Sequence, residues 1–318
     1  SSQIASEIPP VDVVFLDEHG EAAFRNVPTY HYVPIEGVEL PPSWRGLWEI
    51  AHPVAMSEFG ATEIAKVTGS RPPVVYHGVD IETFHPVSAA QPIRLGTGVL
   101  RSKEECKAHF KIPAGSRVLL RTDTNVPRKC WPALLRALAP ILADRLDTLL
   151  LMHTRSADEG GDLRDVWSHF PPAVRRRMIN PGWKDRGFVL SRSELCALYN
   201  AADVYVSTSA EGFGLTIAEA LACGVPAVGM KYSSVPEVIG PAGITVRVDH
   251  LTDNPYAHRW ATVDEEAFGA AVGDLLDDSR KRKLLGAKGP HYVTGAFSWT
   301  RAARQMADII TPRPSLQL

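Results

Sequence analysis

The chain has 318 residues, the length of about two domains. Hydrophobic residues make up 45% and charged residues 22%, the ordinary balance of a globular protein, and 34 basic against 36 acidic residues give a net charge of −2. Proteins that bind nucleic acid usually carry a basic excess, so this balance predicts no nucleic-acid partner. A local basic patch stays compatible with these totals.

No apolar stretch reaches the roughly 18 residues of a membrane-spanning helix, which leaves only peripheral contact with a membrane open. The first residues, SSQIASEIPP, lack the charged start and apolar core of a signal peptide. None of the four cysteines stands in a C-x-x-C pair, so neither a zinc site nor a redox motif is expected. Together these features predict a cytoplasmic protein with isolated, buried thiols.

Short apolar runs alternate with amphipathic helical patterns along the chain. The runs that predict buried strands are 11–16, 54–57, 73–78, 117–121, 148–153, 203–209, 226–230 and 244–248, and the helical patterns include 131–146, 193–202 and 217–224. Strands that alternate with helices of this length indicate βαβ units, and continuous apolar strands indicate a parallel sheet covered on both faces. The fold class is therefore predicted to be α/β.

A change of composition suggests a domain boundary within residues 86–116. This segment contains Pro, Gly, Ser and the charged run RSKEECK, and a new series of strands and helices begins at Val118. We expect an N-terminal part of residues 1–90 and a C-terminal α/β domain of residues 115–297. Ligands of open α/β sheets bind beyond the carboxyl ends of the strands. The segments that follow four of these strands, 122–129, 153–154, 211–215 and 232–237, are therefore expected to meet along one edge.

The segment SAEGFGLTIAEALACGVPAV carries the strongest functional signal. Gly212 and Gly214 allow a tight turn and close approach of a ligand, and the helix that follows offers N–H groups and a positive dipole end to an anion. Glu211 precedes that helix, and Glu219 points back over its first turn. Carboxylates bind hydroxyls rather than phosphate, so this arrangement fits a nucleotide sugar. The alternative is a strand–turn–helix with two solvent-facing glutamates.

The full pattern E-G-F-G-L-x-x-x-E-A-x-A-C-G-x-P resembles the signature of the retaining family-4-type glycosyltransferases, which have the GT-B fold of two Rossmann-like domains facing a cleft. The resemblance implies that Glu211 contacts the hydroxyls of the donor sugar and that Glu219 binds the ribose. It also implies that the backbone at Gly212, Phe213, Gly214 and Leu215 holds sugar and phosphate. Segments 56–64, 73–86, 233–240 and 297–310 resemble the same family, whose last helix, here 298–312, crosses back to the first domain.

Residues 121–131, RTDTNVPRKCW, place two cations before a helix. The family has a basic pair here for the donor's phosphates, and the resemblance implies this role for Arg128 and Lys129, with Asn125 in the same donor-binding loop. A solvated basic pair is the alternative. The family commonly has an arginine five residues before the lysine, where this chain has Thr124. Whether Arg121 replaces it stays open.

The resemblance assigns three further residues. His31, at the end of a strand in the first domain, matches a histidine that faces the donor sugar; the alternative is a histidine packed between tyrosines. Trp183 falls in the loop that contacts the nucleobase, although a core position is the more common use of tryptophan. Glu237 is expected to orient the glycine-rich turn or to touch the donor. Glu36, where the family often has aspartate, receives no role.

The implied reaction is transfer of a hexose with retention, by attack from the leaving-group face. No protein nucleophile is apparent, and no DxD metal signature is present. Arg and Lys balance the diphosphate, so neither a metal nor a cofactor is expected. The donor base, the sugar and the acceptor, which could be a glycan, a lipid-linked sugar or a small molecule, are not readable.

About 75 residues precede His77, roughly half of an ordinary Rossmann-like domain. The N-terminal domain is therefore expected to be either reduced or cut short in this chain. Two other classes stay open. One is a non-transferring enzyme of the same fold, such as an epimerase or a phosphorylase, and the other is a catalytically silent partner subunit that binds nucleotide.

Overall fold

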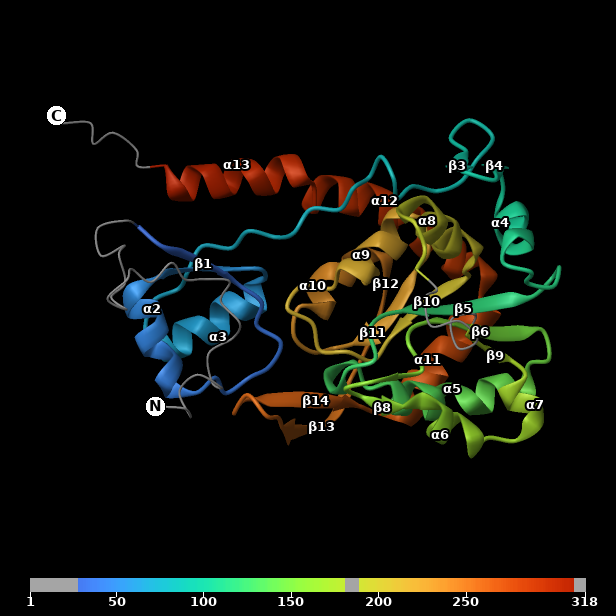
Figure 1. Ribbon diagram of the computed structural model, residues 1–318, viewed down its shortest axis with the longest axis horizontal. Coiled ribbons are helices and arrows are strands. Elements are labelled where there is room, and N and C mark those ends of the chain that lie inside the picture. Colours follow the sequence, from blue (N-terminus) through green and yellow to red (C-terminus); the bar gives the residue numbers. More distant parts are fainter. Residues whose placement is uncertain (1–27, 181–188, 312–318) are drawn as a thin grey trace.

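The computed structural model describes residues 28–180 and 189–311. Its largest feature is a parallel six-stranded sheet with the order β12-β11-β10-β5-β6-β9. The strands are β5 (Arg117–Thr122), β6 (Thr148–His153), β9 (Met178–Ile179), β10 (Val204–Ser207), β11 (Ala227–Met230) and β12 (Gly243–Val246). Helices cover both faces of this sheet (Figure 1), which confirms the predicted α/β class.

Side chains of β5 alternate between two separate cores, as the two-residue period of a strand requires. Leu119 packs in the core formed with α5 (Trp131–Asp144) and α11 (Glu265–Asp277). Val118 and Leu120 pack in the core on the other face, with α8 (Arg192–Ala201), α9 (Leu215–Ala222) and α10 (Val235–Ile239). Because both faces are covered, the strands are mostly apolar.

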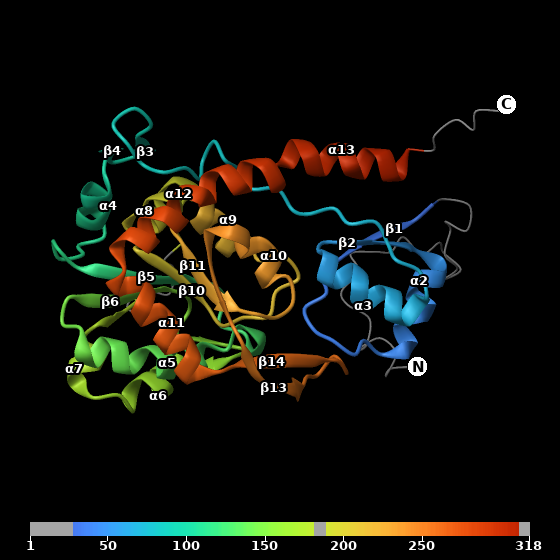
Figure 2. The same cartoon turned by 180° about the vertical axis from the view of Figure 1, so that it is seen from behind.

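The N-terminal part forms a smaller unit beside the sheet (Figure 2). It contains β1 (Tyr30–Val33) paired in parallel with β2 (His52–Ala55), together with η1 (Pro42–Gly46), α2 (Leu47–Ile50) and α3 (Glu58–Thr68). The strand predicted at 73–78 is wrong, because this segment makes only an isolated bridge from Val74 to Ala55. Pro72 and Pro73 supply no N–H groups to a ladder, which limits the pairing. The strand predicted at 11–16 lies outside the described residues.

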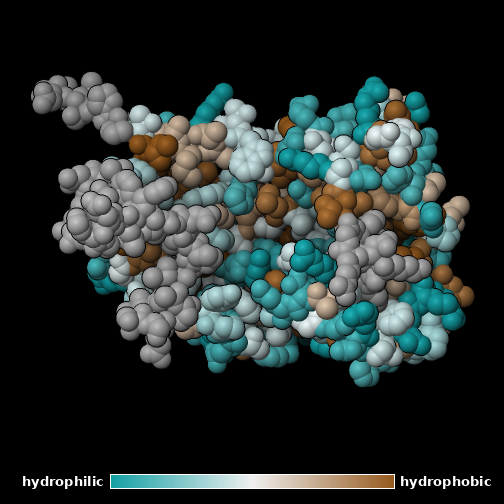
Figure 3. Space-filling view, viewed as in Figure 1, coloured by the Kyte–Doolittle hydropathy of each residue, from teal (hydrophilic) through white to brown (hydrophobic). Residues whose placement is uncertain are grey.

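Two segments connect the N-terminal part to the rest. Helix α13 (Trp299–Ile310) follows α12 (Ser279–Ala296) and runs back over β1 and β2, where Ala302 packs on Val54 and Val75. The hairpin of β13 (Val248–Asp253) and β14 (Arg259–Val263), which was not predicted, reaches the same part through paired backbone hydrogen bonds between Val38 and Arg259. Figure 3 shows apolar side chains exposed on the face over α13.

The expected boundary segment packs against the larger unit. It contains the hairpin β3 (Ile93–Leu95) and β4 (Gly98–Leu100) and the helix α4 (Lys103–His109), and Ile93 and Cys106 are buried in the core that includes α8. The remaining short elements are η2 (Pro127–Lys129), β7 (Ala157–Asp158), β8 (Gly161–Asp162), α6 (Leu163–Ser168), α7 (Pro172–Arg175) and η4 (Gly240–Ala242). Within the described residues, no helix is long and apolar enough to cross a membrane.

Candidate functional site

The segments that follow β5, β6, β10 and β11 meet at the carboxyl edge of the sheet. The N–H of Asp123, after β5, donates to the carbonyl of His153, at the end of β6, at 3.2 Å. Across the other side of β5, the N–H of Ala210, after β10, donates to the carbonyl of Arg128 at 3.4 Å. The sequence prediction that these segments share one edge is therefore confirmed.

The turn between β10 and α9 is held by two serines of the loop after β11. The N–H of Glu211 donates to Ser233 Oγ at 2.9 Å, and Ser234 Oγ donates to the carbonyls of Glu211 and Phe213 at 2.8 and 2.7 Å. Gly214 takes a φ of 106° just before α9, a conformation that favours glycine. The turn thus aims the first N–H groups of α9 at the edge of the sheet, where an anion could bind.

Gly212 touches the N-terminal part. A Cβ atom at this position would lie 2.4 Å from Pro34 Cβ, so no side chain fits while the two parts are together. Beside it, the buried ring of Phe213 packs between His77 and Phe297, with ring centroids 5.5 and 5.1 Å away. The predicted donor-binding turn is therefore also part of the junction between the two parts of the chain.

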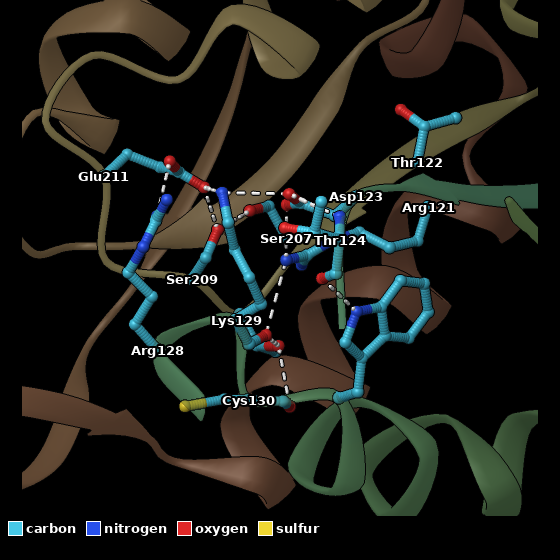
Figure 4. A network of polar contacts seen from close by, with 12 residues as sticks. Arg121, Thr122, Asp123, Thr124, Arg128, Lys129, Cys130, Ser207, Ser209 and Glu211 are labelled. Atoms are coloured by element: carbon cyan, nitrogen blue, oxygen red, sulfur yellow. Dashed lines mark hydrogen bonds and ion pairs between the residues drawn. The ribbon is translucent and has the colours of Figure 1, made fainter. Parts of the chain in front are cut away.

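Glu211 is the centre of a buried ionic network (Figure 4). Its Oε1 accepts hydrogen bonds from Lys129 Nζ at 2.6 Å and Ser209 Oγ at 2.5 Å, and its Oε2 accepts one from Arg128 at 3.1 Å. Lys129 Nζ also contacts Asp123 Oδ1 at 2.9 Å. The structure brings the three predicted residues Glu211, Arg128 and Lys129 together, and it pairs their charges with one another.

This network keeps Glu211 ionised. Burial alone would raise the pKa of its carboxyl. The ion pairs with Lys129 and Arg128, together with the hydrogen bonds from Lys129 and Ser209, outweigh burial and lower the pKa to about 2. Glu211 is therefore a fixed negative charge at neutral pH.

Arg121 does not take the place of the arginine that the family has at Thr124. Its side chain is fully buried, donates to Asp123 Oδ2 at 2.9 Å and to the carbonyl of Lys129 at 3.3 Å, and lies over the ring of Trp131. Strand alternation explains this orientation, because Arg121 shares a face of β5 with the residue two before it and so points toward α5. The guanidinium therefore fixes Asp123 and the backbone of Lys129, two members of the network.

Two carboxylates of the network had no role in the sequence analysis. Asp123 bridges Arg121 and Lys129, and its place directly after a strand was the signal that could have found it. Glu36 comes from the N-terminal part and places Oε1 3.1 Å from Nη1 of Arg128. Burial raises the pKa of Glu36 to about 7, with Arg128 opposing the rise and Glu211 adding to it. The contact of Glu36 cannot be read from the sequence, because it joins distant segments.

Glu219 lies in a different environment, near the middle of α9. Its Oε2 accepts a hydrogen bond from Tyr199 Oη at 2.8 Å, and Tyr199 lies 3.0 Å from Thr122 Oγ1. Tyr205 Oη donates to the carbonyl of Thr122 at 2.9 Å, which completes a chain of hydroxyl groups beneath the carboxylate. Burial raises the pKa of Glu219 to about 7, and the hydrogen bond from Tyr199 only partly offsets the rise.

Other predicted site residues bind neighbouring parts of the protein. The amide of Asn125 is buried and donates to the carbonyls of Ser156 and Gly161. The carboxylate of Glu237 accepts from the N–H groups of Glu58 and Phe59 at 2.8 and 2.7 Å, and so caps α3 of the N-terminal part. Their contacts with a donor stay predictions.

His31 accepts a hydrogen bond from Trp48 Nε1 at 3.3 Å, and burial lowers its pKa, so it is mostly neutral near pH 7. Its contact with a donor sugar is not tested by this geometry. Leu215 begins α9 and is exposed. Trp183 lies outside the described residues. Within those that are described, His, Cys, Asp and Glu side chains form no group of three or more that could hold a metal.

Comparison with known proteins places this edge of the sheet in a family. Residues 122–278, which contain the network and the Glu211–Glu219 segment, match the family described as glycosyl transferases group 1. This domain belongs to the group 1 glycosyl transferases. The predicted resemblance to this glycosyltransferase family is therefore confirmed for the domain, whereas its retaining, family-4-type character stays a prediction.

Two curated relatives of this glycosyl transferase domain are named as mannosyltransferases. The "MMP alpha-(1->4)-mannosyltransferase" of Mycolicibacterium hassiacum is 38% identical over 121 residues, which are 38% of this chain and 27% of that protein. The "GDP-mannose-dependent monoacylated alpha-(1-6)-phosphatidylinositol monomannoside mannosyltransferase" of Corynebacterium glutamicum is 24% identical over 86% of this chain and 67% of its own length. The chain spans about half the length of other curated glycosyltransferases that it matches.

A solved structure shows the same fold over most of the described chain. The Anabaena Alr3699/HepE protein "in complex with UDP and glucose" superposes with a TM-score of 0.66 and 18% sequence identity, over 89% of this chain and 71% of that one. Because the match covers more than residues 122–278, the smaller N-terminal part belongs to the same GT-B arrangement as the glycosyl transferase domain.

Proposed function

We propose that this protein is a retaining glycosyltransferase that moves a hexose from a nucleotide-diphosphate sugar to an acceptor. The observation that carries the proposal is the buried, ionised Glu211 held by Arg128 and Lys129 at the start of α9. Such a carboxylate can accept hydrogen bonds from sugar hydroxyls, while the two cations and the helix N–H groups offer counter-charge to a diphosphate.

The roles follow from the two environments. Glu211 would orient the sugar, and Glu219, whose carboxylate is held by a single hydroxyl donor, would accept hydrogen bonds from the ribose. Arg128, Lys129 and the α9 amides would stabilise the charge that develops on the departing diphosphate. Attack from the leaving-group face, with a donor phosphate oxygen taking the acceptor's proton, needs no protein nucleophile. With this counter-charge in place, the proposal requires no metal.

The relatives direct the choice of donor. One is named as dependent on GDP-mannose and another is named as a mannosyltransferase, while the HepE structure holds UDP and glucose. GDP-mannose and UDP-glucose are therefore the first donors to test. The acceptor, proposed to be a glycan, a lipid-linked sugar or a small molecule, is best sought by pairing each donor with one member of each class.

The decisive measurement is release of free nucleoside diphosphate from each donor, with and without acceptors, in the presence and absence of a chelator. We expect release that depends on an acceptor, does not change with the chelator, and gives an α-linked product from an α-linked donor by NMR. Binding of donor without release under any condition would support a catalytically silent subunit instead. Conversion of the donor sugar without an acceptor would support an epimerase.

A further inference from the structure

Glu36 is the only described residue of the N-terminal part with an ion pair in the Glu211 network. It lies in the segment that touches the donor-binding turn, since Pro34 packs on Gly212. One nitrogen of Arg128 serves three acceptors at once: Glu36 Oε1 at 3.1 Å, Glu211 Oε2 at 3.1 Å and the carbonyl of Ala210 at 3.2 Å.

The network is balanced in charge without a ligand. Three cations face three carboxylates, and the six are Arg121, Arg128, Lys129, Asp123, Glu211 and Glu36. A nucleotide-diphosphate sugar adds two negative charges next to Arg128 and Lys129, in a region that is largely shielded from water. Like charges at this range disfavour one another strongly, so one carboxylate is expected to lose its charge when the donor binds.

Glu36 is the carboxylate that can do so most easily. Glu211 accepts from three side chains and Asp123 pairs with two cations, whereas Glu36 has one ion pair with a cation that it shares. The pKa values agree with this order, because that of Glu36 lies at about 7 and that of Glu211 at about 2. The charged groups that act on Glu36 are Arg128, Glu211, Lys129 and Asp123.

We propose that Glu36 takes up one proton from solvent when a nucleotide-diphosphate sugar binds, and that it thereby sets the alkaline limit of donor binding. This inference rests on the proposed function. The proton goes to the carboxylate of Glu36, and no bond of the donor changes. Above neutral pH the free protein holds Glu36 ionised, so binding must include protonation and the affinity falls as pH rises. Glu219 acts in the opposite sense, since its carboxyl accepts hydrogen bonds from ribose more strongly when it is ionised.

The test is isothermal titration calorimetry with UDP-glucose and GDP-mannose. The diphosphate diesters of both ligands stay fully ionised between pH 6 and pH 9, so a proton taken up by the diphosphate does not enter the measurement. Titrations in two buffers of different ionisation enthalpy give the number of protons taken up. The proteins are wild type, Glu36→Gln, Glu36→Asp, and Glu39→Gln as the matched control, because Glu39 lies in the same segment but pairs with Arg259 on the surface.

For wild type and Glu39→Gln we expect uptake approaching one proton above pH 8 and an affinity that falls about tenfold per pH unit. Glu36→Gln should take up no proton, and its donor affinity should not fall as pH rises above neutral. At pH 8.5 it should bind about tenfold more tightly than wild type. Glu36→Asp should restore both the proton uptake and the fall of affinity at high pH. Equal uptake and slope in wild type and Glu36→Gln would overturn the inference alone. Failure of all four folded proteins to bind either donor would overturn the proposed function as well.

Discussion

Glu211 and Glu219 belong to the same strand–turn–helix segment, yet their surroundings differ in kind. Glu211 lies among cations that hold its pKa at about 2, despite burial. Glu219 has a tyrosine hydroxyl as its hydrogen-bond donor, and burial raises its pKa to about 7. The first region provides a permanent charge, and the second provides a carboxylate whose charge depends on pH.

The difference teaches how one motif would serve the two halves of the proposed donor, a nucleotide sugar. A diphosphate demands fixed cations, and fixed cations buried without a ligand must be neutralised by carboxylates such as Glu211. Ribose hydroxyls need only an acceptor in a defined place. Glu219 is the proposed acceptor, and Tyr199, which itself contacts the hydroxyl of Thr122, holds its carboxylate in position. Removing a group from each region should therefore produce different kinds of damage.

The largest effect is expected for Glu211→Ala. It leaves Lys129 and Arg128 with an uncompensated charge, so the free energy of unfolding should fall by about 3 kcal/mol, measured by chemical denaturation. Turnover should fall at least about 100-fold, since the proposed sugar contact and the alignment of both cations are lost. Glu265→Ala is the control, because it breaks an exposed pair with Arg136 and should cost less than about 1 kcal/mol. Equal stability losses in the two variants would remove the contrast between buried and surface charge.

The second effect concerns affinity rather than stability. Glu219→Ala removes the proposed ribose contact, and donor binding at pH 8 should weaken about 10- to 100-fold, because hydrogen bonds to a charged group contribute about 1.5–3 kcal/mol. Calorimetry measures the loss, and Glu266→Ala, an exposed glutamate, serves as control. An unchanged donor affinity in Glu219→Ala would contradict the assignment of Glu219 to the ribose.

The third effect is a dependence of stability on pH between about 4.5 and 7 that Glu219 should show and Glu211 should not. The folded pKa of Glu219 lies above its ordinary value of 4.5, so its contribution to stability is fully present below about pH 4.5 and is lost as pH rises through 7. Over that range wild type should lose about 1–3 kcal/mol more than Glu219→Gln, measured by urea unfolding at each pH. Tyr199→Phe should move this transition to higher pH, because it removes the hydrogen bond that lowers the pKa. Coincident curves for wild type and Glu219→Gln would exclude the raised pKa.

The smallest effect is expected outside both regions. Glu237 caps α3 across the junction, so Glu237→Ala should lower the free energy of unfolding by about 1 kcal/mol. If Glu237 acts only as this cap, calorimetry should show an unchanged donor affinity. A loss in the free energy of donor binding larger than the loss in the free energy of unfolding would instead support the predicted contact of Glu237 with the donor.

The sequence predicted the framework of the site well, because the framework depends on local patterns. Continuous apolar runs located β5 and β6 to within a residue, and the helical pattern at 131–146 corresponds to α5. Parallel strands place their carboxyl ends on one edge, so the apolar runs alone predicted that the segments after β5 and β10 meet. Periodicity and topology are sufficient for this part of the site.

The pairing of charges could not be predicted in the same way. Arg128, Lys129 and Glu211 looked like separate ligand contacts, since a sequence does not say whether opposite charges face a ligand or one another. The capping of α3 by Glu237 and the ion pair of Glu36 both join the two parts of the chain, so no local pattern contains them. The burial of Arg121 was accessible in principle, because strand parity already assigned it to the face of Leu119.

The contact of Gly212 with Pro34 has a consequence for motion. Pro34 covers Gly212 only while the two parts of the chain stay together, so deuterium exchange at Gly212 is expected to measure how often the junction opens. Amides in the middle of β10, buried within the sheet, are expected to exchange on global unfolding and provide the reference rate. Once each rate is corrected for its intrinsic exchange rate, the ratio of the two gives the difference between the free energies of global unfolding and of junction opening, in a protein with no label attached.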